Sequence, residues 1–391
     1  MDLRTGLPVV GMVGAGQLAR MTHQAAIPLG QSVRLLADSV DDGAALVAHD
    51  VVVGDYRSLA DLRAFAPGCD VVTFDHEHVP NEHLRALEAD GVNVQPGSAA
   101  LRYAQDKQAM RERLTELGVP CPRWAPVPDA AALDAFAERV GWPLVLKATR
   151  GGYDGKGVWV VGTALDAAAV IASGTPLIAE EKVEIVRELA ADVARSPFGQ
   201  GAVWPVVETV QRDGICVEVL APAPDLDEEL AERAQALALR IAAELGVTGV
   251  LAVELFQTSA RPGDEHGGLV VNELAMRPHN SAHWTIEGSC TSQFEQHLRA
   301  VLDYPLGATT PTAPWTVMVN LLGGPDGVTP ALDERIHHLM AHWPEVKLHL
   351  YGKTFRPGRK VGHVTACGAD LELVRRRAAG AADYLMNGGE L

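Results

Sequence analysis

A glycine-rich segment, Gly151-Gly-Tyr-Asp-Gly-Lys-Gly157, combines residue types that could bind an anion. Apolar runs at 143–147 and 158–161 flank it and are typical of strands, so we expect a hairpin loop. Its glycines allow positive φ and let backbone N–H groups approach an anion, and Lys147 stands just before it. The Walker pattern GxxxxGKS/T is absent, and the segment opens no helix. It is therefore either a cover for nucleotide phosphates or a flexible turn.

Two glutamates are expected to face each other across a second hairpin. The apolar runs 250–256 and 269–274 flank a polar loop at 260–267, and the centre of this loop is the midpoint between Glu254 and Glu273. Facing carboxylates repel each other unless a cation joins them. With Asn272 as a further oxygen ligand, the pair predicts a hard-cation site, most simply Mg²⁺ that bridges nucleotide phosphates. The alternative is a pair exposed to water on an edge strand.

A basic cluster lies near the C-terminus, where four cations occupy the eight residues from Lys353 to Lys360. The chain has a formal net charge of −17, so this cluster is hard to attribute to solubility. It predicts a site for a phosphate or carboxylate substrate, in which arginine makes bidentate contacts. The alternative is a basic turn that neutralises acidic neighbours. The stretch 276–285 is rich in hydrogen-bonding groups and is interpreted as a site loop.

The segment Gly14-Ala-Gly-Gln-Leu-Ala19 follows an apolar run at 8–13 and fits the pattern G-x-G-x-x-A. A second apolar run, 32–38, ends in an acid at the distance expected for a Rossmann-type dinucleotide site. An NAD-dependent dehydrogenase is therefore one interpretation. The same turn would also serve any ligand phosphate at the carboxyl end of a parallel strand.

Asp75 and Glu77 follow the apolar run 71–74. In an extended segment these two carboxylates share one side, and His76 and His78 share the other. The carboxylates are expected to accept hydrogen bonds from ligand hydroxyls. A metal site and a solvated turn are the two alternatives.

The elements that position these residues alternate in type. In the first hundred residues, strands are expected at 51–53, 71–74 and 92–94, with helices at 58–66 and 81–89. This alternation predicts a parallel, doubly wound sheet whose strand ends carry a ligand site. A helix then begins with Asp106 as its N-cap and stops at Gly118.

Four prolines between residues 119 and 130 indicate a linker to a second domain, with helices at 129–140 and 165–172. The strand 176–179 of that domain runs into Glu180-Glu-Lys-Val183, which is either an adenine pocket or a charged strand end. From about residue 190 a larger domain follows, with a helix at 231–245 and strands at 315–320 and 347–351. The last twenty residues are expected to form a surface helix and a tail.

Composition limits the class of protein. A chain of 391 residues with 47% hydrophobic content is expected to form two or three domains. Its acidic balance argues against nonspecific binding to nucleic acid or to anionic membranes. Five scattered cysteines without a CxxC spacing favour reduced thiols, and no apolar stretch reaches the roughly 18 residues of a membrane span. We therefore expect a soluble, cytoplasmic protein.

Taken in order, two lysines, a glycine lid, paired carboxylates and a basic cluster predict an ATP-dependent ligase. The chain resembles the ATP-grasp enzymes, and specifically the 5-(carboxyamino)imidazole ribonucleotide synthase family of purine biosynthesis. The motifs that carry this resemblance lie at 11–21, 75–77, 151–157, 272–281 and 351–363. Departures from the family pattern are Ala19, Asp75, Met276 and Ala282.

The resemblance implies an α/β (α+β overall) ATP-grasp fold. It comprises a Rossmann-like N-terminal domain at 1–104, a lid domain at 105–188 and a C-terminal domain at 189–391, with a terminal β subdomain from about 312. The family also suggests a homodimer whose product passes to a separate mutase.

The implied reaction has two stages. ATP phosphorylates bicarbonate to carboxyphosphate, and ADP leaves. Carboxyphosphate, or CO₂ released from it, is then captured by the exocyclic amine of 5-aminoimidazole ribonucleotide. Alternatives are another ATP-grasp ribotide ligase, such as the formate-dependent glycinamide ribonucleotide transformylase, an NAD-dependent oxidoreductase, and a noncatalytic ATP sensor.

The resemblance also implies roles for individual residues. ATP binding is implied for Lys107, Lys147, Gly152, Tyr153, Asp154, Gly155, Lys156, Gly157, Glu180, Glu181, Lys182, Val183, Glu188, Gln211, Asn272 and Glu273. Substrate binding is implied for Gly16, Gln17, Leu18, Asp75, Glu77, Tyr153, His279, Asn280, Ser281, Lys353, Arg359 and Lys360. Mg²⁺ would bind to Glu254 and Glu273. Asp154 could position or deprotonate the amine, and the other implied catalytic residues are Lys353 and Arg356.

Overall fold

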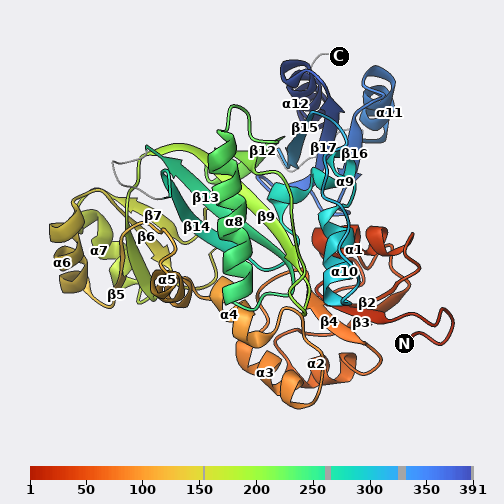
Figure 1. Cartoon of the computed structure of the whole chain (residues 1–391), viewed down its shortest axis with the longest axis horizontal. Coiled ribbons are helices and arrows are strands. Elements are labelled where there is room, and N and C mark those ends of the chain that lie inside the picture. The colour runs from red at the N-terminus through yellow and green to blue at the C-terminus, as the bar shows by residue number, and fades with distance from the viewer. Residues whose placement is uncertain (153–154, 260–265, 325–331, 389–391) are drawn as a thin grey trace.

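The structure is a computed structural model that describes residues 1–152, 155–259, 266–324 and 332–388. Its described residues form three sheets, which Figure 1 shows as three regions around the long helix α8. In that view the first sheet lies at the lower right, the second at the left, and the third runs through the centre to the upper right. No helix among the described residues has the length and apolar character needed to cross a membrane.

The first sheet is parallel, as predicted, with the strand order β3-β2-β1-β4. Its strands are β1 (Val9–Val13), β2 (Ser32–Ala37), β3 (Asp50–Val53) and β4 (Val71–Phe74). The helices around it are α1 (Gln17–Ala26), α2 (Leu59–Phe65), α3 (Asn81–Ala89) and α4 (Ser98–Gln105). β1 and β4 are adjacent, so the segments that follow them start at the same edge of the sheet. The prediction of a strand over 92–94 was wrong in extent, because this segment forms an isolated parallel bridge between Val94 and Val72 instead of a full strand.

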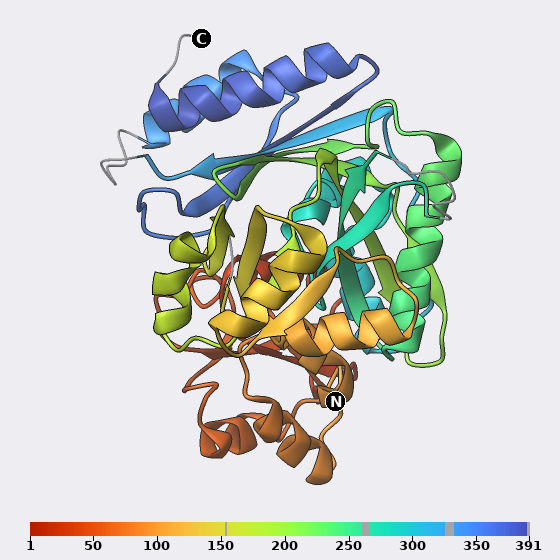
Figure 2. The ribbon, with the colours of Figure 1, turned by 90° about the vertical axis from the view of Figure 1, so that its left-hand side faces the viewer.

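The second sheet is antiparallel, in the order β5-β8-β6-β7. Its strands are β5 (Trp124–Val127), β6 (Leu144–Ala148), β7 (Val158–Val161) and β8 (Leu177–Glu181), and α6 (Ala130–Val140) and α7 (Ala164–Ala172) pack on it. Figure 2 views the molecule from the side on which this sheet lies. The proline-rich segment predicted as a linker therefore contains β5. A proline is tolerated there because β5 lies at the sheet edge.

Helix α5 (Lys107–Glu116) precedes this second sheet. The Asp106 side chain accepts hydrogen bonds from the N–H groups of Gln108 and Ala109, at 3.0 and 3.1 Å. The predicted N-cap is therefore confirmed. Because the cap fixes where the helix begins, it also fixes the direction in which Lys107 leaves the first turn.

The third sheet has nine antiparallel strands among the described residues, in the order β14-β13-β9-β11-β12-β15-β17-β16, with β10 paired to β9. They are β9 (Ile185–Arg195), β10 (Gly201–Val203), β11 (Val207–Arg212), β12 (Ile215–Ala221), β13 (Gly249–Thr258), β14 (Leu269–Ala275), β15 (Trp315–Leu322), β16 (Lys347–Leu350) and β17 (Lys360–Gly368). The boundary predicted at 188/189 falls inside β9. The strands expected in a terminal subdomain continue this same sheet, because β15 pairs with β12.

The remaining helices are α8 (Glu228–Glu244), the short η1 (Asn280–Ala282), α9 (Thr285–Gly288), α10 (Gln293–Val301), α11 (Leu332–His342) and α12 (Leu371–Asn387). The final helix α12 is more than the surface helix that we predicted. Val374, Ala378, Ala381 and Leu385 follow helical spacing and are buried in one apolar cluster with residues of β15 and β17.

His297 of α10 joins the first sheet to the third. Its Nδ1 accepts the N–H of Val250 at 3.1 Å, so the neutral ring carries its proton on Nε2. That Nε2 lies 2.8 Å from the Thr73 hydroxyl on β4. The imidazole is fully buried, and burial lowers its pKa to about 4, so it remains neutral. This contact fixes the position of the first sheet, and of the residues at its carboxyl edge, relative to the third.

Candidate active site

A cavity of about 850 Å³ lies between the second sheet, the β11–β12 hairpin and the β13–β14 hairpin. Its walls include most of the residues predicted to bind ATP or Mg²⁺, which are Lys107, Lys147, Gly155, Glu180, Glu181, Lys182, Val183, Glu188, Gln211, Glu254, Asn272 and Glu273. His279, Asn280, Ser281 and Lys360 line the same space. Gly152, Lys156 and Gly157 belong to the neighbouring glycine loop, while Tyr153 and Asp154 lie outside the described residues.

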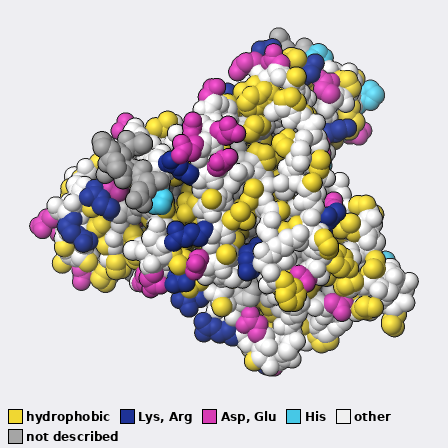
Figure 3. Space-filling view, viewed as in Figure 1, with side chains coloured by type: hydrophobic (Ala, Val, Ile, Leu, Met, Phe, Trp, Pro, Cys, Tyr) yellow, Lys and Arg dark blue, Asp and Glu magenta, His cyan; other side chains and the backbone are white. Residues whose placement is uncertain are grey.

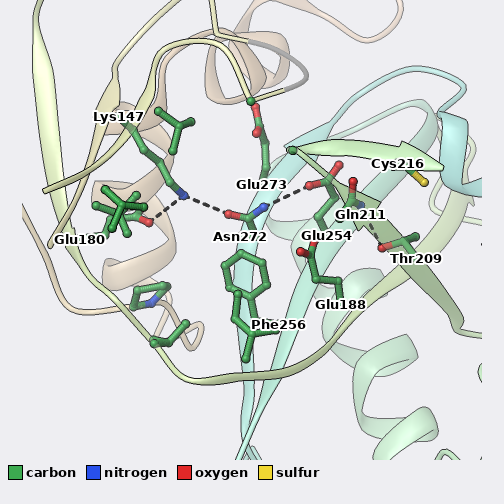
Figure 4. A pocket seen from close by; sticks show the side chains of 18 of the residues that line it. Lys147, Glu180, Glu188, Thr209, Gln211, Cys216, Glu254, Phe256, Asn272 and Glu273 are labelled. Atoms are coloured by element: carbon green, nitrogen blue, oxygen red, sulfur yellow. Dashed lines mark hydrogen bonds and ion pairs between the residues drawn. The ribbon is translucent and has the colours of Figure 1, made fainter. Parts of the chain in front are cut away.

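The two glutamates face each other as predicted, because Glu254 pairs with Glu273 in the β13–β14 ladder. The next residue, Leu255, pairs with Val271, so Asn272 is an extra residue in β14 and forms a β-bulge. In a regular strand Asn272 and Glu273 would point to opposite faces. Here the bulge turns Asn272 toward Glu254, and its Nδ2 donates to Glu254 Oε2 at 3.1 Å (Figure 4).

The carboxyl pair has the electrostatics of a cation site. Burial in the cavity wall, followed by the neighbouring charges of Glu273 and Glu188, raises the pKa of Glu254 to about 7. About a third of the Glu254 side chain (34%) remains exposed to the cavity, so a ligand can reach it. Two carboxylates and an amide oxygen are the donor set that Mg²⁺ accepts. The residues present therefore fit the predicted metal.

The two lysines predicted to hold phosphates reach this cavity from different elements. Lys147 on β6 donates to Glu180 Oε2 at 2.7 Å and to Asn272 Oδ1 at 3.0 Å (Figure 4). Lys107 on α5 pairs with Glu273 Oε1. Lys107 thus lies beside one of the carboxylates that would hold the metal, and Lys147 lies beside the Asn272 amide between them. Sequence spacing could not show this, because the Lys107–Glu273 and Lys147–Asn272 contacts join residues more than a hundred positions apart.

In the segment 180–183, which was predicted as an adenine pocket or a charged strand end, the two carboxylates pair with basic side chains of the protein itself. Glu180 Oε1 accepts from Arg111 Nε at 2.7 Å, in addition to its Lys147 contact, and Glu181 Oε2 pairs with Arg123 Nη2 at 2.6 Å. A nucleotide base would therefore meet the backbone of 180–183 and the side chains of Lys182 and Val183. Sequence reasoning missed Arg111. The signal for it was its spacing, one helical turn after Lys107.

The glycine loop has the backbone that its composition predicted. The φ angles of Gly151, Gly155 and Gly157 are +78°, +75° and +73°, values that residues other than glycine rarely adopt. A Cβ atom on Gly155 would lie 3.4 Å from the Cα of Gly214, in the β11–β12 turn. The loop therefore reaches from the second sheet to the third sheet across one end of the cavity.

A second group of predicted residues meets at the carboxyl edge of the first sheet. The Gly16 N–H donates to Asp75 Oδ2 at 2.5 Å, and Lys353 Nζ donates to Gln17 Oε1. A Cβ atom on Gly14 would lie 1.8 Å from Asp75 Oδ1, so the carboxylate fills the glycine turn. The turn is thus occupied by protein where a dinucleotide would place its pyrophosphate, and the NAD-dependent interpretation does not hold. Burial raises the pKa of Asp75 to about 6, and the Gly16 N–H opposes this shift.

The site loop 276–285 connects this second group to the cavity. At one end Glu77 Oε1 accepts from the Met276 N–H at 2.7 Å, and Glu77 Oε2 lies 3.4 Å from Arg277 Nε. Further along, His279 Nε2 lies 3.4 Å from Glu254 Oε1. Ligands in the two places would therefore be bound by adjacent parts of one loop.

Three other predicted substrate or catalytic residues are placed differently. The Leu18 side chain is buried in an apolar cluster with Phe294 and Tyr351, so only its backbone could contact a ligand. Arg359 Nη1 donates to Thr354 Oγ1 at 2.8 Å within its own loop. Arg356 is exposed on that same loop.

Inside the site loop, Ser281 is held by a residue that sequence reasoning missed. Its hydroxyl lies 2.9 and 3.1 Å from the two carboxyl oxygens of Asp192 and 2.9 Å from His279 Nδ1. The Ser281 hydroxyl is therefore used within the protein and supports the His279 ring. The neighbouring Asn280 Nδ2 is buried and has no hydrogen-bond partner among the described residues, so it is available to a ligand.

Asp192→Asn is expected to stabilise the ligand-free protein in a pH-dependent way. Burial raises the pKa of Asp192 from 3.8 to about 7, so the folded chain binds more protons than the unfolded chain between these values. Stability therefore falls as pH rises through this window, whereas asparagine does not titrate. Chemical denaturation should show a gain of up to about 4 kcal/mol at pH 8 and less than half of that at pH 5. Asp41→Asn, at an exposed position, is the control, and a gain independent of pH would contradict this account.

Three family models match successive parts of the chain: the ribonucleotide synthetase preATP-grasp domain at 7–105, the ATP-grasp domain at 112–294 and the phosphoribosylaminoimidazole carboxylase C-terminal domain at 316–377. The N5-carboxyaminoimidazole ribonucleotide synthase of Mycobacterium tuberculosis is 58% identical over 385 residues, which are 97% of this chain and 88% of that protein. The synthetase structure from Thermus thermophilus matches with a TM-score of 0.85 and 39% identity, over 98% of this chain and 99% of that one. The Aspergillus clavatus synthase, solved with ADP and 5-aminoimidazole ribonucleotide, matches with a TM-score of 0.86 and 32% identity, over 97% and 98%.

The fold and the cavity define an ATP-grasp enzyme, an ATP-dependent ligase that forms ADP. The first family match contains the first sheet, the second contains the second sheet and strands β9 to β14 of the third, and the last covers strands β15 to β17 of the third. The chain belongs to the N5-carboxyaminoimidazole ribonucleotide synthase family. The resemblance inferred from the motifs is thereby confirmed, together with the predicted fold class.

Proposed function

We propose that this chain carboxylates the amine of 5-aminoimidazole ribonucleotide through carboxyphosphate, as a step of purine biosynthesis. A bicarbonate oxygen attacks the γ-phosphorus of ATP, and ADP leaves. The amine nitrogen then attacks the carbon of carboxyphosphate, or CO₂ released from it. The new C–N bond forms as phosphate leaves and the nitrogen loses a proton. The observation that carries this proposal is the continuity from the nucleotide cavity, along the site loop, to the Gln17–Asp75–Lys353 group.

In the first half-reaction, Lys107 and Lys147 would hold the ATP phosphates, and the backbone of 180–183 would hold the adenine. Glu188 and Gln211 line the same cavity beyond that segment. There the Glu188 carboxylate could accept hydrogen bonds from the nucleoside, and the Gln211 amide could donate or accept them. Glu254, Glu273 and Asn272 would hold Mg²⁺, which offsets the negative charge on the transferred phosphoryl group. The Asn280 amide and the His279 ring would orient bicarbonate; in the described part of the chain, the unpartnered amide and the contact of His279 with Glu254 support this role.

In the second half-reaction, Lys353, Arg359 and Lys360 would bind the ribotide phosphate. Gln17, Asp75 and Glu77 at the edge of the first sheet would contact its ribose. Arg356 lies on the same loop and could hold bicarbonate or carboxyphosphate. Tyr153 and Asp154 would meet the amine from the glycine loop. The support for this division is spatial, since Lys353 contacts Gln17 at the edge of the first sheet and is not a wall of the nucleotide cavity.

Exclusion of water is a further requirement, because carboxyphosphate hydrolyses in water. The glycine loop from Gly151 to Gly157 would act as a lid over both substrates. Its backbone contact with the turn at Gly214 supports this, since closure of the loop there covers one end of the cavity.

We further propose that the chain divides into functional units at residues 104 and 188. The first unit contains the first sheet, the second contains the second sheet and the start of β9, and the third contains the rest of the third sheet. A homodimer, a cytoplasmic location and delivery of the product to a separate mutase complete the proposal. The five cysteines support a reducing compartment, since none of them forms a disulfide in the described part of the chain. The view in Figure 3 supports small-molecule partners over nucleic acid, since acidic and basic side chains are interspersed on that face.

Phosphate release is the test of the proposed function. We expect phosphate to form at a substantial rate only when ATP, Mg²⁺, bicarbonate and 5-aminoimidazole ribonucleotide are all present. Release that requires formate and glycinamide ribonucleotide instead would favour the transformylase alternative. Binding of nucleotide without any turnover would favour the ATP sensor.

A further inference from the structure

Arg111 is a fully buried arginine next to the nucleotide cavity. It lies on α5, one turn after Lys107, and its side chain has no exposed surface. Its Nε donates to Glu180 Oε1 at 2.7 Å, its Nη2 donates to the Asn272 carbonyl at 2.7 Å, and its Nη1 lies 3.7 Å from Cys121 Sγ. Arg111 is not among the cavity walls, so it does not contact a nucleotide directly.

The partner of Arg111 is also the partner of a phosphate-binding lysine. Glu180 divides its two oxygens, with Oε1 on Arg111 and Oε2 on Lys147, each at 2.7 Å. Glu180 is 2% exposed, and burial alone would raise its pKa. The Arg111 and Lys147 charges outweigh burial and hold its pKa below the ordinary value, so the group is an anion.

The three charges therefore carry a net charge of +1, and the uncompensated charge is presented by Lys147 on the cavity wall. Without Arg111, Glu180 and Lys147 would neutralise each other. Both are buried, where charges interact more strongly than at an exposed surface. A neutral Glu180–Lys147 pair would attract the triphosphate less than the group of three charges, whose net charge is positive.

The second contact of Arg111 acts on the metal-binding strand. The Asn272 carbonyl belongs to the bulged residue of β14, which has no partner in the β13 ladder. Arg111 Nη2 supplies a donor to that carbonyl, while the Asn272 side chain reaches Lys147 and Glu254. One guanidinium thus fixes β8 of the second sheet and the bulge in the third sheet at the same point.

We propose that Arg111 is a positioning residue for nucleotide binding: by taking one oxygen of Glu180, it keeps the Lys147 charge available to the phosphates. This inference rests on the proposed role of Lys147. An electrostatic role differs from a packing role, because the loss of nucleotide affinity on removing Arg111 then depends on the negative charge of Glu180.

The test is the affinity of the intact protein for ADP with Mg²⁺, measured by titration calorimetry without bicarbonate or ribotide. Arg111→Met should weaken binding about tenfold to a hundredfold, the range expected for a lost charge-assisted contact. Arg111→Lys retains the charge and should stay within about threefold of the parent protein. Arg113→Met is the matched control, because Arg113 lies on the same helix with an exposed partner, Glu116, and should not change affinity.

The double variant decides between charge and shape. In Arg111→Met/Glu180→Gln the anion is removed together with its counter-ion, which leaves the single positive charge of Lys147, so binding should return toward that of the parent protein. If Arg111→Met is not recovered folded, this same comparison still applies. Equal weakening by Arg111→Lys and Arg111→Met, or binding by the double variant as weak as that of Arg111→Met or much weaker than that of the parent protein, would overturn the proposal. These measurements need no carboxylation, so a failure of the proposed reaction would be seen separately in the phosphate assay.

Discussion

Glu273→Gln is expected to lower kcat/KM for ATP about a hundredfold to a thousandfold, the range for removing one charged group that stabilises a transferring phosphoryl group. The substitution keeps the size of the side chain and removes one of the two facing carboxylates. It also removes the counter-ion of Lys107. The cation site would then have one anion fewer, while the γ-phosphoryl group of ATP still requires neutralisation. The measurement is ADP formation as a function of Mg²⁺ concentration.

The dependence on Mg²⁺ separates loss of the metal site from a general loss of activity. A higher Mg²⁺ concentration should restore part of the Glu273→Gln activity, because a weakened site is filled by mass action. Glu229→Gln on α8 is the control, since that glutamate is exposed and pairs with Arg233 one turn away. If Glu273→Gln leaves Mg²⁺-dependent ATP turnover intact, the assignment of the metal to this carboxyl pair is wrong.

The facing of Glu254 and Glu273 could be predicted from sequence because a hairpin has a simple register. Two apolar runs around a polar loop fix which residues are opposite, and alternation fixes which share a face. The Asp106 cap and the positive φ values in the glycine loop were predictable for a similar reason. Each depends on local backbone chemistry that one or two residue types supply.

The bulge at Asn272 could not be predicted, because it shifts the register by one residue without a mark in the apolar pattern. Sequence reasoning placed Asn272 at the metal site only as a neighbour of Glu273, and a regular strand would have pointed it away. Arg111 and Asp192 were missed because each acts through a partner 69 or 89 positions distant. Such buried polar contacts depend on how the sheets are packed together, which composition and periodicity do not encode.

Strand β9 shows the same limit at the level of the fold. No strand was predicted over its charged first half, around Glu188, and a domain boundary was placed inside the strand. In the structure β9 pairs with β13 along its whole length, so Glu188 lies opposite Phe256 and near the carboxyl pair. A strand whose polar half lines a cavity loses the alternation by which strands are recognised.

Lys353→Ala is expected to raise the KM for 5-aminoimidazole ribonucleotide about tenfold to a hundredfold and to change the KM for ATP much less. Lys353 donates to Gln17 at the edge of the first sheet, and its charge acts on the buried Asp75 carboxyl. It is not a wall of the nucleotide cavity. Steady-state kinetics with each substrate varied in turn measures both constants, and Lys347→Ala, at an exposed position on β16, is the control.

The comparison of the two KM values tests the division of the site as well as the residue. The Lys353 ammonium lies 5.8 Å from the centre of the Tyr351 ring, and the buried Tyr351 hydroxyl lies 2.6 Å from His363 Nδ1. The segment that carries Lys353 is therefore anchored in the third sheet, while the lysine itself reaches the first. A rise confined to the KM for the ribotide would mean that Lys353 acts where the first and third sheets meet. Equal effects on both KM values would instead place Lys353 at the phosphates of ATP, and the ribotide would then have to bind elsewhere along the site loop.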